Sequence, residues 1–257
     1  MHAIRPALAA ARRAAGPLVL ALAAALAGAA APPLTGAQST TTPVSIVGKL
    51  RELNQAAVEI RHIAFTPSVG AVILHGRNDA TWIRVPTSTG DKLRELINAG
   101  SLIRYVAFAP DGGWVILHGT NEATWNGIPT ALADKIRELY AAGNQMKAVA
   151  FTPSGGWIIL HGGNGANWST VPQTAVDKLR ELNQAGETFR GIAFSAGGWV
   201  LLHGANEATW NGIPQGTADK IRELYAAGNQ MKQIAFTSAG GWIILHGTNA
   251  AVWSNVP

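Results

Sequence analysis

Three residue types recur at one spacing along the chain and could together form a binding site. Each copy of the stretch typified by "GGWVILHGTNEATW" carries a histidine, an asparagine three residues later and a tryptophan four residues after that. An indole face is a flat apolar platform, and imidazole and amide groups form hydrogen bonds, so the set suits a sugar ring. The candidate ligand-binding residues are Trp82, Trp125, Trp168, Trp210, Trp253, His75, His118, His161, His203, His246, Asn78, Asn121, Asn164, Asn206 and Asn249.

The same residues also have a purely structural interpretation. Tryptophan would fill space between neighbouring units, histidine would donate to a neighbouring carbonyl, and asparagine would close the turn with a hydrogen bond from its side chain to the backbone. If they instead bind sugars, each pocket is expected to be weak, and several pockets on one rigid frame would gain by multivalency. The sequence leaves both interpretations open.

Metal binding and catalysis receive less support. Metal sites normally combine three or four ligands, and no carboxylate recurs beside histidine in every copy, so no metal ion or other cofactor is predicted. The recurring acids lie on the polar side of predicted helices, and no serine recurs with a histidine and an acid. We therefore predict no catalytic residues and no enzymatic activity.

The copies belong to a longer internal repeat. From residue 48 onward the chain consists of five units, most of them 42 or 43 residues long. Units two and four are especially alike, as are units three and five, which indicates duplication of a two-unit segment. Repeats of this length are typical of solenoids and propellers. The units are 48–90, 91–133, 134–176, 177–218 and 219–257, in a single repeat domain.

One helix and two or three strands are expected in every unit. In the second unit, "YVAFAP" from Tyr105 and "WVILHG" from Trp114 are short apolar strands around a tight "DGG" turn. The segment 120–129 predicts a turn and a short third strand. The following "TALADKIRELYAAG" predicts a helix that Thr130 caps and Gly143 ends.

Side-chain directions follow from these elements. Alternation along the strand places Trp114, Ile116 and His118 on one side, and Val115 and Leu117 on the other. A strand that is apolar on both sides is expected to be buried on both.

Helical spacing gives the following helix one apolar stripe. Leu132, Ile136, Leu139 and Tyr140 form this stripe, while charged residues face outward.

The hairpin "VAFAPDGGWVILHG" resembles the central hairpin of a WD40-type β-propeller blade. The resemblance covers about fifteen residues of each unit, and it implies a toroid with paired strands near the axis. This chain departs from that family because each unit has a helix of about four turns and lacks the Trp-Asp dipeptide. Helices are therefore expected outside the strands.

We expect the five units to close on themselves as an α/β propeller-like toroid. An isolated unit cannot bury its apolar faces, and an open α/β solenoid, the alternative fold, needs polar end units. The fifth unit keeps its apolar strand, whereas the first has lost its strand tryptophan to Ala71. Because only one end shows signs of capping, closure is favoured.

The N-terminus predicts export. Residues 1–37 combine Arg5, Arg12 and Arg13 with an apolar run and small residues, which is typical of a secretory signal peptide. Cleavage after Ala37 or within residues 29–31 fits, and an uncleaved anchor is the alternative. The chain has no cysteine, which excludes a lipid anchor on cysteine. A polar linker, residues 38–47, precedes the repeats.

Charge limits the choice of partners. Removal of the three N-terminal arginines lowers the formal net charge from +5 to +2, so nucleic acid is not an expected partner. The expectation is a secreted or periplasmic, non-enzymatic, multivalent binding protein without a membrane span after cleavage. Its expected partners are glycans first and a surface protein second, with a protein-interaction or structural scaffold as the alternative.

Overall fold

The computed structural model describes residues 45–257, which form five copies of one helix and one three-stranded sheet. The predicted signal peptide and residues 38–44 of the predicted linker lie outside the described residues, whereas residues 46 and 47, also assigned to the linker, begin the first helix. Each predicted unit boundary falls inside a helix. The helices are α1 (Ile46–Gln55), α2 (Thr87–Asn98), α3 (Thr130–Ala141), α4 (Gln173–Gln184) and α5 (Gln215–Ala226).

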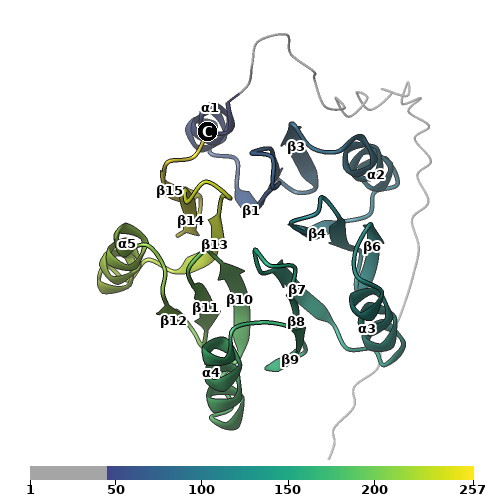
Figure 1. Cartoon of the computed structure of the whole chain (residues 1–257). Helices are drawn as coiled ribbons and strands as arrows, with labels where there is room; N and C mark the ends of the chain where they lie inside the picture. The colour runs from purple at the N-terminus through teal and green to yellow at the C-terminus, as the bar shows by residue number, and fades with distance from the viewer. Residues whose placement is uncertain (1–44) are drawn as a thin grey trace, which may run out of the picture. The chain divides into compact units, whose positions relative to one another are not determined.

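All five sheets are antiparallel and have the order first, middle and third strand (Figure 1). The first strands are β1 (Ile60–Phe65), β4 (Ile103–Phe108), β7 (Met146–Phe151), β10 (Phe189–Phe194) and β13 (Met231–Phe236). The middle strands are β2 (Ala71–His75), β5 (Trp114–His118), β8 (Trp157–His161), β11 (Trp199–His203) and β14 (Trp242–His246). The third strands are β3 (Asp79–Ile83), β6 (Glu122–Asn126), β9 (Gly165–Ser169), β12 (Glu207–Asn211) and β15 (Ala250–Ser254).

The first hairpin of each sheet depends on glycine. In the second unit the turn has Gly112 at φ +91°, a backbone region that L side chains rarely adopt. At the next position, a Cβ on Gly113 would lie 2.1 Å from the carbonyl oxygen of Gly127. The "GG" pair therefore serves two purposes, a positive φ and a close backbone approach.

Two predicted helix and strand boundaries are wrong. The helix cap is Pro129 without a side-chain hydrogen bond, and Thr130 is the first helical residue. Proline fixes its own φ and disfavours helical geometry in the residue before it, so it marks the helix start without a polar cap. The first strand of the second unit begins at Ile103 and not at Tyr105, so it includes Arg104.

The predicted helix end is confirmed. Gly143 has φ +67° and its N–H donates to the Tyr140 carbonyl, while the N–H of Asn144 donates to the Leu139 carbonyl. This pair of bonds is a Schellman motif. Leu139 is buried as predicted, but Tyr140 is 55% exposed, because the apolar face is narrower than the sequence stripe.

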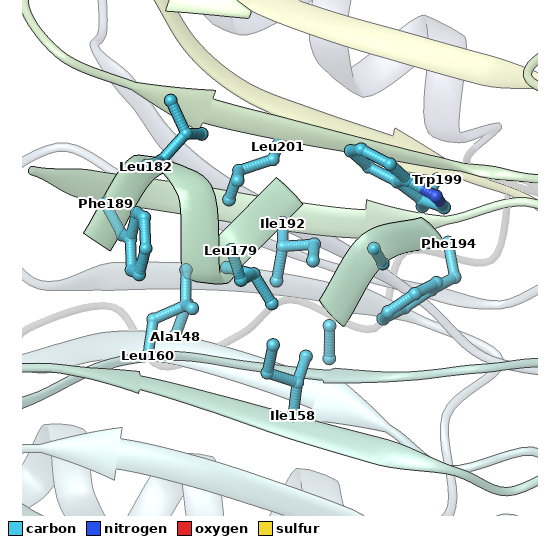
Figure 2. Packing of buried hydrophobic residues seen from close by; sticks show 12 residues of the cluster. Ala148, Ile158, Leu160, Leu179, Leu182, Phe189, Ile192, Phe194, Trp199 and Leu201 are labelled. Carbon is cyan, nitrogen blue, oxygen red and sulfur yellow. The ribbon is translucent and has the colours of Figure 1, made fainter. Parts of the chain in front are cut away.

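The hydrophobic core is divided into five clusters, each formed by two neighbouring sheets and the helix between them. Figure 2 shows one cluster, in which Ile158 of β8 and Leu201 of β11 face each other across Leu179 of α4. Trp114 and Ile116 lie in one cluster and Val115 and Leu117 in the next. The middle strands are therefore buried on both faces, as predicted.

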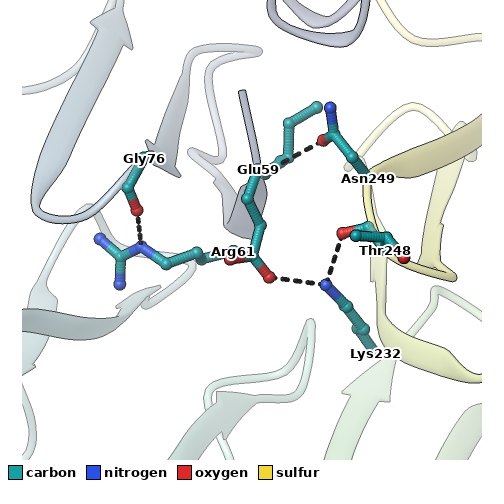
Figure 3. Close-up of polar contacts among 7 residues, drawn as sticks. Glu59, Arg61, Gly76, Lys232, Thr248 and Asn249 are labelled. Carbon is teal, nitrogen blue, oxygen red and sulfur yellow. Dashed lines mark hydrogen bonds and ion pairs between the residues drawn. The ribbon is translucent and has the colours of Figure 1, made fainter. Parts of the chain in front are cut away.

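The first and fifth units contact each other through the same type of cluster. Leu50 of α1 packs in one cluster with Ile243 and Leu245 of β14 and with Ile73 of β2. Polar contacts also join the two units, among them three near the first strands, of which Figure 3 shows the first two. Ile60 N–H donates to Asn249 Oδ1 at 3.1 Å, Lys232 Nζ donates to Glu59 Oε1 at 2.7 Å, and the Gln233 amide bonds both backbone groups of Ile63 at 2.8 Å.

The architecture is a propeller-like repeat. First strands of successive sheets contact one another, as do those of the first and fifth sheets. In Figure 1 the helices lie on the far side of the sheets from the first strands, as the sequence predicted. Within residues 45–257, no helix has both the length and the apolar character needed to cross a bilayer.

Candidate functional site

The five candidate tryptophans after the histidines lie in the third strands, and Trp125 falls within the segment for which a short third strand was predicted. In the second unit Trp125 pairs with Val115, because the polar segment folds back on the middle strand. All five indoles are half-buried and pack against the clusters. Each indole therefore contributes to a core cluster and remains partly exposed to solvent.

An arginine from a helix covers each of these indoles; it is the helix that follows in the chain for the first four, and α1 for Trp253. The guanidinium carbon lies 5.3–5.8 Å from the ring centroid, within the range of a cation–π interaction. The covered face is not free for a sugar ring unless the arginine moves. The pairs are Arg94 with Trp82, Arg137 with Trp125, Arg180 with Trp168, Arg222 with Trp210, and Arg51 with Trp253.

The candidate asparagines join one unit to the next. Asn121 Nδ2 donates to the Asn144 carbonyl at 3.1 Å, and its Oδ1 accepts from Met146 N–H at 2.8 Å. Asn78 and Asn206 make the same pair of bonds, while Asn164 makes a donated bond and Asn249 an accepted one. The prediction that asparagine closes its own turn is therefore wrong, since the bonded backbone belongs to the following unit.

Three of the candidate histidines bond to a side chain of their own unit, whereas neither ring nitrogen of His246 has a partner among the described residues. His75 Nε2 lies 3.0 Å from Thr81 Oγ1, His118 Nδ1 lies 3.0 Å from Ser101 Oγ, and His203 Nε2 lies 2.9 Å from Thr209 Oγ1. These partners are hydroxyls and not the neighbouring carbonyl that was predicted. Burial lowers the pKa of His75, His118, His161 and His246, so these imidazoles are neutral at pH 7.

The predicted set meets most fully in the third unit. His161, Asn164 and Trp168 line one hollow of about 450 Å³ beside α4. In the fourth unit, His203 and Trp210 line a hollow of about 390 Å³. Asn206 is not among the residues that line this second hollow.

A different set of residues forms a cationic cavity that the sequence prediction missed. The cavity measures about 120 Å³ and receives one cation from the second residue of every first strand. None of the lining residues that the structure describes is acidic. The five cations are Arg61, Arg104, Lys147, Arg190 and Lys232.

Backbone carbonyls hold the cations around this cavity, and Lys232 is in addition paired with Glu59. Arg61 Nε donates to the Gly76 carbonyl (Figure 3), and its Nη1 donates to the Ile103 carbonyl of the next unit, both at 2.9 Å. Arg104 makes the corresponding bond to Met146, and Arg190 to Met231. Lys147 has a single long bond of 3.4 Å to the Gly163 carbonyl.

Several buried guanidinium nitrogens have no partner among the described residues. They are Arg61 Nη2 and Arg104 Nε and Nη2. Burial lowers the pKa of Arg61, Arg104 and Arg190, but arginine starts so high that all three remain cations at neutral pH. Such groups favour an anion, because a buried donor left unsatisfied is costly.

The next position of the first strands differs in every unit. It holds His62, Tyr105, Ala148, Gly191 and Gln233. The His62 and Tyr105 rings lie 4.1 Å apart, and His62 Nε2 donates to the Val106 carbonyl at 2.8 Å. Burial lowers the pKa of His62 to about 4 and raises the pKa of Tyr105. This position therefore breaks the repeat with neutral side chains.

At the other end of the same strands, the last residue is always phenylalanine. These rings line a hollow of about 330 Å³ together with the hairpin turns. The phenylalanines are Phe65, Phe108, Phe151, Phe194 and Phe236.

The sequence contains a signal for both sets. Aligning "IRHIAF", "IRYVAF", "MKAVAF", "FRGIAF" and "MKQIAF" shows a basic second residue and a final phenylalanine in each unit. The basic residue was missed because the predicted strand started one residue after it.

No known protein family matches the chain, and no curated protein sequence matches it. Among solved structures, the chain is similar to one described as "YCF48 bound to D1 peptide". The sequence identity is 11%, the alignment covers 76% of this chain and 78% of that chain, and the TM-score is 0.37.

Proposed function

We propose that the chain is a non-enzymatic scaffold that binds an acidic segment of a protein partner at the cationic cavity. The observation that carries this proposal is that all five units direct a lysine or arginine to one cavity whose described lining contains no acid. Guanidinium groups bind carboxylates with directed, charge-assisted hydrogen bonds. Repeating one cation per unit is an economical way to build such a site.

The size of the cavity favours a carboxylate as the bound group. About 120 Å³ accommodates a side-chain or terminal carboxylate with a few waters, but not a nucleotide. Carbonyl bonds already position the arginines, so little side-chain ordering remains to oppose binding. Nucleic acid therefore stays outside the proposal, as the charge of the repeat domain also suggests.

A closed ring of five units is part of this proposal. Its support is that α1 packs on the fifth sheet as α2 packs on the first, and that Arg51 covers Trp253 as Arg94 covers Trp82. Closure would hold the five cations at fixed mutual distances. An open arrangement would let the cations of the first and fifth units separate.

Leu50→Ala tests closure against a matched substitution, Leu93→Ala. The two leucines occupy equivalent helix positions and are at most 1% exposed. In a closed ring both variants lower the free energy of unfolding by about 3 kcal/mol in urea titrations. A Leu50→Ala cost far below that of Leu93→Ala would exclude closure in solution.

The proposal has two further parts: the protein is exported, and it does not catalyse a reaction. The recurring acids Glu95, Glu138, Glu181 and Glu223 are exposed and pair with a lysine three residues before them, which supports a role on the helix surface. Export rests on the character of residues 1–37, and fusion of this segment to a reporter enzyme tests it.

Sugar binding remains a second candidate, because one hollow of about 450 Å³ is lined by His161, Asn164 and Trp168. Arg180 lies over Trp168 and would have to move for a sugar to stack. A glycan array comparing the wild type with Trp168→Ala tests this candidate. It is rejected if no glycan distinguishes the two proteins.

Fluorescein-labelled hexaglutamate provides the direct test of the main proposal. We expect its fluorescence anisotropy to rise with the wild-type protein, and labelled hexaglutamine and a single-stranded oligonucleotide to bind at least about tenfold more weakly. Lys147→Gln removes the least engaged cation and should weaken binding about fivefold. Lys92→Gln removes a cation from the outside of a helix and is the control. Equal effects of the two variants would refute the assignment of the cavity.

A further inference from the structure

The fourth unit contains a cluster that no other unit has. Glu187 precedes β10, His203 ends β11 and Glu207 begins β12. One ligand atom from each of the three lies within 4.8 Å of the other two. The cluster is independent of the cationic cavity, which these residues do not line.

His203 is prepared for a ligand at its Nδ1 atom. The side chain is 9% exposed, and its Nε2 lies 2.9 Å from Thr209 Oγ1, which orients the imidazole. Nδ1 is buried and has no hydrogen-bond partner in residues 45–257, and it lies 3.6 Å from Glu187 Oε2. That separation is too long for a hydrogen bond, so a buried nitrogen faces the carboxylates without one.

A glycine makes room for the two carboxylates. A Cβ on Gly204 would lie 2.1 Å from Glu207 Oε2 and 2.8 Å from Glu187 Oε2. The equivalent Gly119 of the second unit has only Glu122 nearby, and Gly162 of the third unit has no atom within 4 Å of such a Cβ. The space beside the glycine is therefore common to the repeats, whereas two acids share it only in the fourth unit.

Sequence differences between units explain this restriction. The residues equivalent to Glu187, two before each first strand, are Val58, Ser101, Asn144 and Asn229. The residues that pair with the other four histidines, where Glu207 pairs with His203, are Asp79, Glu122, Gly165 and Ala250. The second unit thus shares the histidine and one glutamate but has serine in place of the other.

We propose that Glu187, His203 and Glu207 bind a divalent transition-metal ion, with Zn²⁺ the best match. One imidazole nitrogen and two carboxylate oxygens are ligands that zinc accepts, and three protein ligands leave a position for water or a partner's side chain. The Thr209 hydroxyl would act as the outer partner that orients a metal-bound imidazole. Binding would join the loop before β10 to the turn between β11 and β12.

Titration of the untagged, chelator-treated protein with ZnCl₂ by isothermal calorimetry tests the site. We expect one ion per chain in the wild type, and a loss of affinity of about tenfold or more in both Glu187→Gln and Glu207→Gln. Glu122→Gln changes the equivalent glutamate of the second unit, and it should bind zinc as the wild type does. Circular dichroism confirms that each variant is folded.

Thermal unfolding adds a second measurement. Zinc should raise the Tm of the wild type and of Glu122→Gln but not that of Glu187→Gln, because a ligand of the folded state stabilises it. Absence of zinc uptake by the wild type would overturn the proposal. An equal loss of affinity in Glu122→Gln and Glu207→Gln would also overturn it, since binding would then not be specific to the fourth unit.

Discussion

The two ends of the first strands each carry one kind of residue that recurs in all five units, and the five copies together line a cavity or hollow. At one end, five cations surround a cavity of about 120 Å³, and at the other, five phenylalanines surround a hollow of about 330 Å³. Like charges cannot pack together, so carbonyls of neighbouring units hold them apart. Phenylalanine rings repel neither each other nor an apolar guest. The same backbone thus offers a cationic cavity at one end and an apolar surface at the other.

The third residue of each first strand lies between the two ends and is the least repetitive of these positions. His62 and Tyr105 are large, whereas Ala148 and Gly191 are small. All of these residues except Ala148 line the cavity of about 120 Å³, so a large side chain in every unit would fill it. The separation of the cationic cavity from the phenylalanine hollow therefore depends on the side chains between them.

His62→Gln should remove a loss of stability that the wild type suffers at low pH, and this is the largest effect expected. The pKa of His62 is about 4 in the folded protein and 6.5 when unperturbed, so the folded state binds fewer protons between these values. The stability that neutral His62 contributes is full above pH 6.5 and is lost as the pH falls toward 4. The wild type should lose about 3 kcal/mol more than His62→Gln over this range.

Urea titrations at pH 7.5 and 4 measure this difference. Glutamine is a suitable replacement because Gln233 holds the equivalent position in the fifth unit, and its amide can still donate to the Val106 carbonyl. His118→Gln is the matched control at a partly exposed histidine. Its gain in stability over the wild type at pH 4 should be smaller than that of His62→Gln. Equal pH dependence of wild type and His62→Gln would show that His62 does not remain neutral and buried.

Sequence periodicity predicted most of the fold but only part of the site. The unit count follows from the internal repeat. The hairpins follow from the glycine turns, and the two buried faces of strands such as β5 follow from their apolar residues, all of which are local features. Arg137 over Trp125 was not predictable, because that contact requires knowing which sheet a helix covers. The link from Asn121 to Met146 joins neighbouring units in the same way.

The cations of the first strands were not predicted for another reason. Arg104 appeared to lie before its strand, and only alignment of all five units shows that a cation recurs there. The cluster at Glu187 has the opposite character, because it depends on a difference between units and comes from three separate segments. A repeated pattern reveals the residues that the units share, whereas this cluster lies where the units differ.

Arg104→Gln combined with Arg190→Gln should weaken the cationic end with the second-largest effect. Both arginines line the cavity, and loss of two charge-assisted contacts should reduce hexaglutamate affinity about thirtyfold, or about 2 kcal/mol. The remaining affinity should depend less on salt between about 50 and 300 mM NaCl than that of the wild type. Anisotropy titrations measure the affinity and its salt dependence. An unchanged salt dependence would show that hexaglutamate does not bind at the cavity.

Phe108→Ala should affect only the apolar end, and it has the smallest expected effect. Phe108 is half-buried and lines the hollow, so its removal should lower the free energy of unfolding by about 1 kcal/mol and reduce the fluorescence of a bound naphthalene sulfonate dye. Hexaglutamate affinity should stay within about twofold of the wild type, because no charge near the cavity changes. Tyr140→Ala removes an exposed aromatic ring from a helix and should change none of the three measurements. If Phe108→Ala weakened hexaglutamate binding as strongly as the double arginine variant, the two ends would have to be coupled through His62 and Tyr105. The side chains that fill the middle would then transmit a change between the ends instead of separating them.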